Sequence, residues 1–240
     1  MYTPRLLSTR LFSISNLRIE NRDAVWRSTP EYDELVQLEW KDILRRARTR
    51  VWDGTYYRVL NPSVFEGNEP SPILLGTIAY RYIATFPSLS QEHSRFNLDP
   101  LNHLSTVALI RTTDDLYVFG VRKRNGTVDL IGGGVQSDEI EIHSGADLET
   151  NLHKEIFEEA GLNRADIEDL PGIGIVLSGT SNVLIVGYSQ LTVNSAEVQK
   201  RFEQRTDDEI NRLVFVSANK AREFLIQMSD YRRLLTQLEW

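Results

Sequence analysis

Three glutamate residues near position 155 have a spacing that could support metal chemistry. Glu155, Glu158 and Glu159 are spaced i, i+3 and i+4, so on an α-helix they fall within about 100° of arc. Carboxylates that converge on one face repel one another, which costs free energy unless cations lie among them. Their hard oxygen atoms suit Mg²⁺ or Mn²⁺, ions that keep coordination positions open for water and phosphate oxygens. The spacing therefore marks a candidate divalent-metal site.

An acidic helix face is more often simply solvated, and the neighbouring residues decide between the two interpretations. Glu and Lys are good helix formers, and Lys154 can pair with Glu158 at i+4. Upstream, however, Gly132 to Gly134 follows an expected strand and permits close backbone approach. Downstream, Gly161 is a stop signal for the helix. A strand, a glycine loop, a helix with three convergent acids and a glycine stop together favour a site.

Residues 154–162 (KEIFEEAGL) resemble the signature box of the Nudix hydrolases, whose pattern is G-x5-E-x7-R-E-U-x-E-E-x-G-U, with U an aliphatic residue. The matching positions are Glu155, Ile156, Glu158, Glu159, Gly161 and Leu162. The box is the specific part of a resemblance that spans roughly residues 101–220.

Three departures from the box bear on the expected activity. Lys154 stands at the arginine position, where Lys keeps the charge but lacks the planar fork with which the family's Arg positions a catalytic carboxylate. Ala146 stands where the family has its first Glu, a mainly structural position. The stretch from Gly134 to the helix is about six residues too long, which places an insertion near residues 137–143. Because the Glu-x-x-Glu-Glu core is intact, we expect an active enzyme.

The resemblance implies a Nudix-type α/β/α sandwich with a mixed sheet, and a Nudix pyrophosphohydrolase activity. In that activity Mg²⁺ or Mn²⁺ assists the attack of water on the diphosphate of a nucleoside diphosphate linked to another moiety. The implied metal ligands are Glu155, Glu158, Glu159 and the backbone carbonyl of Gly133, with Gly132 and Gly134 as alternatives to Gly133. The implied catalytic residues are Glu158, Glu159 and Lys154.

Residues outside the box extend the expected site. Many family members add a distant acid as a further ligand or general base, and Glu209 is our choice within residues 207–209, although a capping or loop role explains it equally well. Arg122, near the end of an expected strand, is a candidate contact for substrate phosphate; an exposed edge-strand charge is the alternative. Four tyrosines offer a stacking surface for a base, with ordinary packing as the alternative: Tyr56, Tyr57, Tyr80 and Tyr82.

The first hundred residues bear on the substrate. A set of upstream residues resembles the region before the box in Nudix enzymes that cleave UDP-sugars such as UDP-glucose to UMP and a sugar 1-phosphate. The set is Asp53-Gly54, Arg58, residues 75–81 (LGTIAYR) and Ala84-Thr85. A nucleotide-sugar diphosphatase is therefore the first expectation, and an enzyme for ADP-ribose or another nucleoside diphosphate derivative is the second. Lys154 and Ala146 keep a third open, a Nudix domain that has lost catalysis and binds a ligand as a sensor.

The elements that position these residues follow from apolar periodicity and turn signals. We expect helices at residues 30–50, 146–160, 195–204 and over most of 218–240, with Ser144 and Asp147 as a capping box. We expect strands at residues 55–60, 105–111, 116–121, 128–131, 173–178, 183–191 and 213–216. Residues 73–84 fit either type, and residues 86–100 indicate a connecting loop. The class is α/β, with an N-terminal α+β extension (1–100, a candidate substrate-binding part) and a Nudix domain (101–240).

Composition excludes several other classes of protein. The chain has 240 residues, of which 41% are hydrophobic and 25% charged, as in an ordinary globular protein. It has no cysteine for disulfides or thiolate sites, and no apolar run long enough for a membrane-spanning helix. A net charge of −7 argues against nucleic acid as a partner. The resemblance implies a small-molecule partner, a nucleoside diphosphate derivative. We expect a cytoplasmic location, although residues 1–18 faintly resemble a transit peptide. Trp26, Trp40 or Trp52, if exposed, would mark a homodimer contact.

Overall fold

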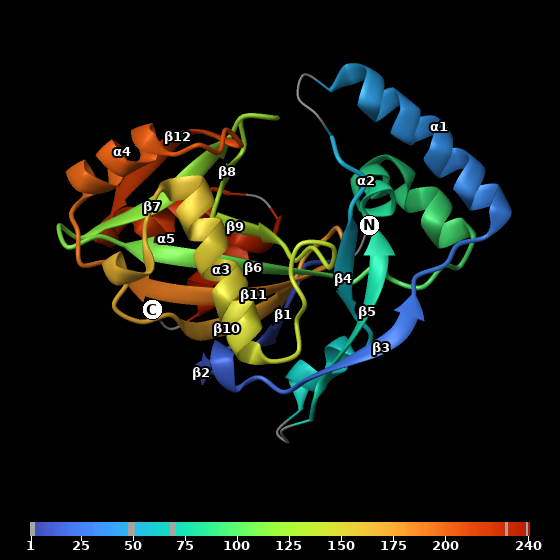
Figure 1. The fold of residues 1–240 in the computed structure, drawn as a ribbon, viewed down its shortest axis with the longest axis horizontal. Coiled ribbons are helices and arrows are strands. Elements are labelled where there is room, and N and C mark those ends of the chain that lie inside the picture. The colour runs from blue at the N-terminus through green and yellow to red at the C-terminus, as the bar shows by residue number, and fades with distance from the viewer. Residues whose placement is uncertain (1–2, 48–50, 68–70, 229, 239) are drawn as a thin grey trace.

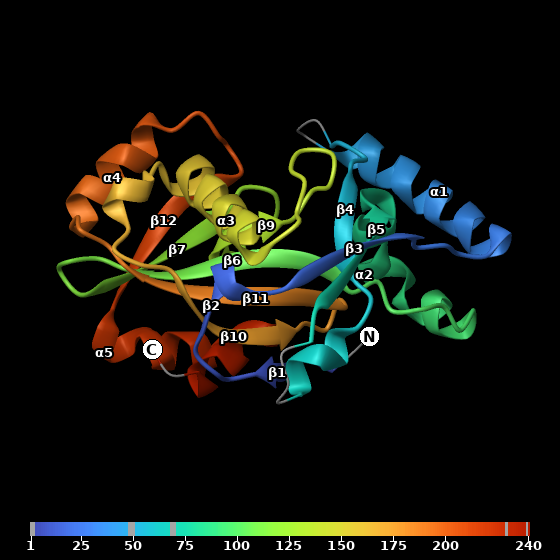
Figure 2. The ribbon, with the colours of Figure 1, turned by 60° about the horizontal axis from the view of Figure 1, so that its bottom comes forward.

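The computed structural model describes residues 3–47, 51–67, 71–228, 230–238 and 240. A twelve-stranded mixed sheet runs through these residues, with helices on both sides of it (Figures 1 and 2). The strands are β1 (Arg5–Ser8), β2 (Phe12–Ser13), β3 (Ile19–Val25), β4 (Thr55–Val59), β5 (Ile73–Ala79), β6 (His103–Arg111), β7 (Leu116–Arg122), β8 (Val128–Asp129), β9 (Ile131–Gly134), β10 (Pro171–Leu177), β11 (Asn182–Gln190) and β12 (Ile210–Ser217). The α-helices are α1 (Pro30–Arg46), α2 (Tyr80–Arg95), α3 (Gly145–Ala160), α4 (Ser195–Gln204) and α5 (Ala218–Ile226).

Strand β6 is the centre of the sheet. It pairs in parallel with β11 over its whole length, from His103 opposite Asn182 to Arg111 opposite Gln190. On its other side it pairs with the glycine strand β9, antiparallel. Strand β10 continues the sheet beyond β11. Strand β7 pairs with the end of β6 and, along most of its length, with β12. The glycine strand is thereby held against the most buried strand of the protein.

The two faces of β6 belong to two different cores. Ala108 and Ile110 face a core that includes the apolar side of α3, whereas Val107 and Leu109 face a second core that includes α5 and the C-terminal 3-10 helix at Asp230–Gln237. Alternation of this kind follows from the period of two along a strand. Figure 2 shows α3 on one side of the sheet and α5 on the other. The mixed α/β class expected from the sequence is confirmed.

The N-terminal part contains α1, α2 and strands β3 to β5. It has its own core, in which Trp26, Tyr32 and Phe86 are buried. Strand β4 joins it to the main sheet, where Arg58 lies opposite His103. The first strands of the chain, β1 and β2, pair instead with β10 at the far edge of the main sheet. The division of function between residues 1–100 and 101–240 stays a prediction.

The expected loop at residues 86–100 is wrong, because α2 runs from Tyr80 to Arg95 through Pro87. Tyr82, Phe86 and His93 recur at helical spacing, and burial of this face in the N-terminal core outweighs the cost of an internal proline. The ambiguous residues 73–84 divide into the whole of β5 and the start of α2. At the C-terminus, α5 ends at Ile226 and a 3-10 helix replaces the expected longer α-helix.

The expected helix that carries the box is confirmed as α3. It begins at a capping box formed by Ser144 and Asp147 and ends at Gly161 with φ of 72°. Trp26 and Trp40 are buried, and Trp52 is 61% exposed, so the expectation of a homodimer contact now concerns Trp52 alone and stays a prediction. No helix of the described residues is long and apolar enough to cross a membrane.

Candidate active site

Helix α3 presents its three acids at the boundary between its buried and exposed sides. Leu148, Leu152, Ile156 and Ala160 form a fully buried stripe that packs on the sheet. Glu159, next to Ala160 in the sequence, is also buried, with 3% of its surface exposed. The side chain of Glu155 is 15% exposed and that of Glu158 is 42% exposed. The three carboxylates thus have graded environments.

Glu159 is held by the strand beside the helix. Arg122, at the end of β7, donates from Nη1 to the Glu159 carboxylate and from Nη2 to the Gly132 carbonyl at 2.6 Å. The backbone N–H of Gly132 donates to Glu159 Oε2 at 2.7 Å. These bonds tie α3, β7 and β9 together at one point. Burial raises the pKa of Glu159 to about 7, although Arg122 and the Gly132 N–H work in the opposite direction.

Strand β9 needs glycine where it meets these residues. Gly132 has φ of 130°, in the region that glycine alone adopts readily, and a Cβ there would lie 2.3 Å from the Thr106 carbonyl oxygen. At Gly133 a Cβ would lie 2.7 Å from Glu155 Oε2. The glycine run therefore allows both a special backbone turn and the direct approach of a carboxylate to the backbone.

Glu155 is the acid that is least compensated. It lies 3.8 Å from Lys154 Nζ, a longer separation than the other ion pairs of the helix. The pKa of Glu155 is raised to about 8. Burial is the larger cause, and repulsion from the Glu159 carboxylate is the second. A buried carboxylate of this kind favours either a proton or a nearby cation.

Lys154 makes close ion pairs on two sides. Its Nζ lies 3.0 Å from Glu158 Oε2 and 3.0 Å from Glu139 Oε2. Partial burial by itself lowers the pKa of Lys154, but the bonds to Glu139 and Glu158 outweigh it and raise the pKa. The lysine at the arginine position of the box therefore contacts the acids of α3.

The two predicted residues outside the box lie side by side. Glu209 immediately precedes β12, and its Oε2 lies 3.7 Å from Arg122 Nη1, with the Glu209 side chain 71% exposed. Asp208 turns away to Lys123, at 2.6 Å. Arg122 is directed toward Glu159, so a phosphate contact by Arg122 stays a prediction.

Sequence reasoning missed the contribution of Glu139, and it named the N-terminal tyrosines without placing them beside the glycine strand. A Cβ at Gly134 would lie 2.6 Å from the ring of Tyr56, which stacks on Tyr80 with centroids 5.3 Å apart. Tyr80 Oη in turn accepts from Arg124 Nη1 at 3.3 Å. The aromatic residues at 56 and 80 were visible in the sequence as a stacking candidate. Their position beside the glycine strand depends on the pairing of the two halves of the sheet.

The donor atoms fit a divalent ion that is completed by its substrate. Within the described parts of the chain, no three His, Cys, Asp or Glu side chains are arranged to hold a metal ion by themselves. Glu159 is engaged by Arg122 and the Gly132 N–H. Mg²⁺, however, is commonly bound through one or two carboxylates, with waters and substrate phosphates as the other ligands. Glu155 and Glu158, with the Gly133 backbone against Glu155, supply that kind of set.

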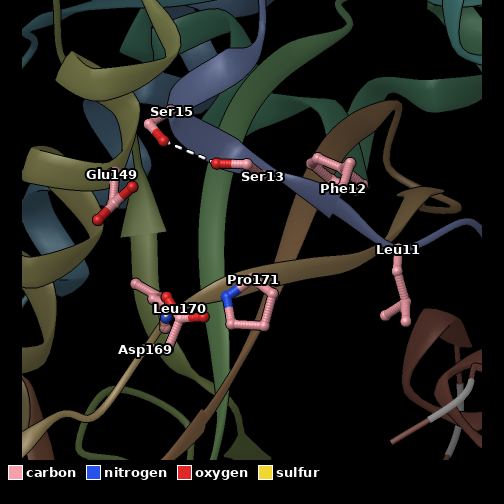
Figure 3. Close-up of a pocket in the computed structure, with 8 residues that line it drawn as sticks. All are labelled: Leu11, Phe12, Ser13, Ser15, Glu149, Asp169, Leu170 and Pro171. Atoms are coloured by element: carbon pink, nitrogen blue, oxygen red, sulfur yellow. Dashed lines mark hydrogen bonds between the residues drawn. The ribbon is translucent and has the colours of Figure 1, made fainter.

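A separate surface pocket lies near the beginning of α3 (Figure 3). Its lining residues are Leu11, Phe12, Ser13, Ser15, Glu149, Asp169, Leu170 and Pro171. None of these is a predicted site residue.

Comparisons with known proteins give structural likeness only. No protein-family model matches the chain, and no curated protein matches it. Tm1382, provisionally described as a Nudix hydrolase, is 12% identical over 82% of this chain and 92% of its own, with a TM-score of 0.44. A NUDIX-family hydrolase from Clostridium perfringens is 17% identical over 58% of this chain and 96% of its own, with a TM-score of 0.38. An ADP-ribose pyrophosphatase from Streptococcus suis is 20% identical over 50% and 75%, with a TM-score of 0.32.

Proposed function

We propose that this chain is a Nudix-type hydrolase that uses Mg²⁺ or Mn²⁺ to hydrolyse a nucleoside diphosphate linked to another moiety. The observation that carries the proposal is the environment of Glu155, a nearly buried carboxylate that lies beside the Gly133 backbone. Within the described residues, its ion pair is the long one with Lys154, at 3.8 Å. Arg122 and Lys154 compensate Glu159 and Glu158, and a divalent ion would compensate Glu155. The intact Glu-x-x-Glu-Glu pattern on a confirmed helix supports the same conclusion.

The proposed roles of the site residues differ. Glu155, Glu158 and the Gly133 carbonyl would hold the ion, which when bound neutralises phosphate charge and lowers the pKa of a water molecule. Glu159 holds β9 against α3 through Gly132, and it would enter the ligand set only when Arg122 turns away. Lys154 orients the Glu158 carboxylate. Glu209 would act as the distal acid, at the exposed side of Arg122.

We propose that the substrate is a nucleotide sugar such as UDP-glucose. Water hydrolyses its diphosphate, and the products are UMP and a sugar 1-phosphate. The support is the likeness of residues 53–85 to the UDP-sugar branch, together with the place of Tyr56 and Tyr80 beside β9. ADP-ribose or another nucleoside diphosphate derivative is the alternative. In either case we propose that the partner is a small molecule and neither nucleic acid nor a membrane. We also propose that the protein is located in the cytoplasm.

A second candidate, a sensor that binds such a ligand without turnover, is favoured by one contact. Lys154 bridges Glu158 and Glu139, so a cation of the protein already occupies part of the acidic face. Lysine also lacks the planar fork with which arginine binds both oxygens of a carboxylate, so it fixes the direction of that carboxylate less well.

One assay separates these functions. The protein is incubated with Mg²⁺ and a panel of UDP-sugars, ADP-ribose and dinucleotides, and released monophosphates are measured. We expect turnover of UDP-glucose or a related nucleotide sugar, and its loss in Glu158→Gln with the fold retained by circular dichroism. Tight binding of one compound without turnover of any would support the sensor instead. Undiminished activity of Glu158→Gln would refute the assigned site.

A further inference from the structure

We infer that Glu139, which lies in the insertion before α3, is a positioning residue that holds Lys154 in place over the acids of the helix. The inference rests on the proposed function, because it assigns a role at the same site. Its basis is the pair of equal contacts of Lys154 Nζ, 3.0 Å from Glu139 Oε2 on one side and 3.0 Å from Glu158 Oε2 on the other. Glu139 lies in the insertion into the box pattern, so nothing in that pattern predicts it.

Lysine needs such a partner more than arginine does. An arginine fork fixes its own direction against a carboxylate through two parallel bonds, whereas an ammonium group is a point charge on a flexible stem. Two carboxylates, each 3.0 Å from Nζ, restrict the position of the Lys154 ammonium more than one would. In that position it lies 3.8 Å from Glu155 Oε1, with which it forms a longer ion pair.

The insertion is well placed to present Glu139, because neighbouring residues fasten it to the N-terminal part. The backbone N–H of Ser137 donates to the Thr55 carbonyl at 2.7 Å, and Asp138 accepts from the Thr55 N–H at 3.3 Å. Further along, Ile142 is fully buried, and its N–H donates to the Tyr57 hydroxyl at 3.1 Å. These bonds lie on both sides of Glu139.

Two departures from the box therefore compensate for each other in this chain. The lysine at position 154 loses the fork, and the longer loop supplies an additional carboxylate that restrains the lysine. The same ion pair joins the loop to α3, so the N-terminal part, the insertion and the acid helix are connected through Lys154.

A matched pair of variants tests the inference. Glu139→Gln removes the anchor and keeps the shape of the side chain. Glu141→Gln is the control, because Glu141 lies in the same loop, has a side chain 86% exposed and pairs with His143. We expect Glu139→Gln to lower kcat about fivefold with KM unchanged, the size expected of an ion pair that is partly exposed. Glu141→Gln should leave both constants unchanged.

A double-mutant cycle shows whether Glu139 acts through Lys154. In a Lys154→Met background, Glu139→Gln should cause no further loss of kcat. A further loss as large as that in the wild-type background would overturn the inference, and so would equal effects of Glu139→Gln and Glu141→Gln.

A readout that needs no turnover keeps this test separate from that of the proposed function. The lysine ammonium signals are recorded by ¹H–¹⁵N NMR, and the Lys154 signal is assigned by its absence in Lys154→Met. We expect this signal to be sharp in the wild type and in Glu141→Gln, and broadened by exchange with water in Glu139→Gln. An unchanged Lys154 signal in Glu139→Gln would overturn the inference even if the protein hydrolysed nothing. Absence of turnover with the expected NMR result would refute the proposed function alone.

Discussion

Arg122 and Glu159 form a buried ion pair that fastens the end of β7 to α3, and both residues also bond the backbone of Gly132. The side chains are 20% and 4% exposed, so water does little to stabilise either charge if its partner is removed. The glycine strand, which approaches Glu155, is held in place by the same bonds. This relationship leads to a first prediction about stability.

Arg122→Met should destabilise the protein by about 3 kcal/mol, because it leaves Glu159 buried without its cation. Urea unfolding measures the change in the free energy of unfolding. Arg124→Met, at an exposed position in the turn that follows β7, is the matched control and should change it by less than about 0.5 kcal/mol. The double variant Arg122→Met with Glu159→Leu should recover part of the loss, since both charges are then gone. A loss below about 1 kcal/mol in Arg122→Met would contradict the assignment of a buried pair.

Gly133→Ala should separate folding from activity. The added Cβ would lie 2.7 Å from Glu155 Oε2, the far end of a flexible side chain that can turn away at little cost in stability. The displaced carboxylate would no longer lie beside the Gly133 backbone, so we expect about a hundredfold loss of kcat/KM and weaker Mn²⁺ binding by calorimetry. Gly67→Ala, where the nearest atom lies at an ordinary 3.6 Å, is the control. Wild-type Mn²⁺ affinity in Gly133→Ala would exclude a ligand pair made of Glu155 and Gly133.

The parts of this site that were predictable are those with local causes. Helix α3 begins at a capping box, ends at a glycine and carries an apolar stripe, and all three signals lie within its own sequence. Helix α2 was not predicted, because Pro87 and the polar residues around it are typical of a loop. Burial of Phe86 and His93 against the N-terminal core stabilises this helix. Local pattern cannot show a packing partner that lies elsewhere in the chain.

The contacts that modify the site are non-local for the same reason. Arg122 and Glu159 are 37 positions apart, and Glu139 and Lys154 are 15 apart. The sequence indicated an insertion near residues 137–143 but contained no signal for which of its acids turns toward the helix. The spacing of Glu155, Glu158 and Glu159 placed them on one face, and the tertiary contacts then gave each a different partner.

The stability of the metal-free protein should fall as pH rises. Burial raises the pKa of Glu155 to about 8, above the 4.5 expected in an unfolded chain. Between these values the folded state binds more protons than the unfolded state, so the free energy of unfolding decreases with increasing pH, by on the order of 2 kcal/mol from about pH 5 to pH 8. Urea unfolding at several pH values measures this slope. Glu155→Gln should reduce it, with the raised pKa of Glu159 leaving a smaller slope of the same sign, and the exposed Glu141→Gln should leave it unchanged.

Metal binding should show the opposite dependence on pH. A divalent ion needs Glu155 deprotonated, so Mn²⁺ should bind more tightly at pH 8.5 than at pH 6.5 and release protons as it binds. Isothermal titration calorimetry in buffers of different ionisation enthalpy measures the number of protons released. Binding that is independent of pH, or proton release that persists unchanged in Glu155→Gln, would place the ion on other residues.

Tyr80 provides a test of the substrate side of the site. Its hydroxyl accepts from Arg124, and its ring covers Tyr56, which in turn covers Gly134, so it links the N-terminal part to the glycine strand. Tyr80→Ala should raise KM for the nucleotide sugar about fivefold and change kcat less than about twofold, because it alters binding without touching the acids of α3.

Tyr82→Phe is the control for a tyrosine of the same helix, since the Tyr82 hydroxyl bonds Asp33 inside the N-terminal part at 2.7 Å. It should cost about 1 kcal/mol of stability and leave KM unchanged. Initial rates at varied substrate concentration, with urea unfolding in parallel, measure both effects. If Tyr80→Ala and Tyr82→Phe changed KM equally, the effect would come from a loosened N-terminal part, and Tyr80 would have no direct place at the substrate.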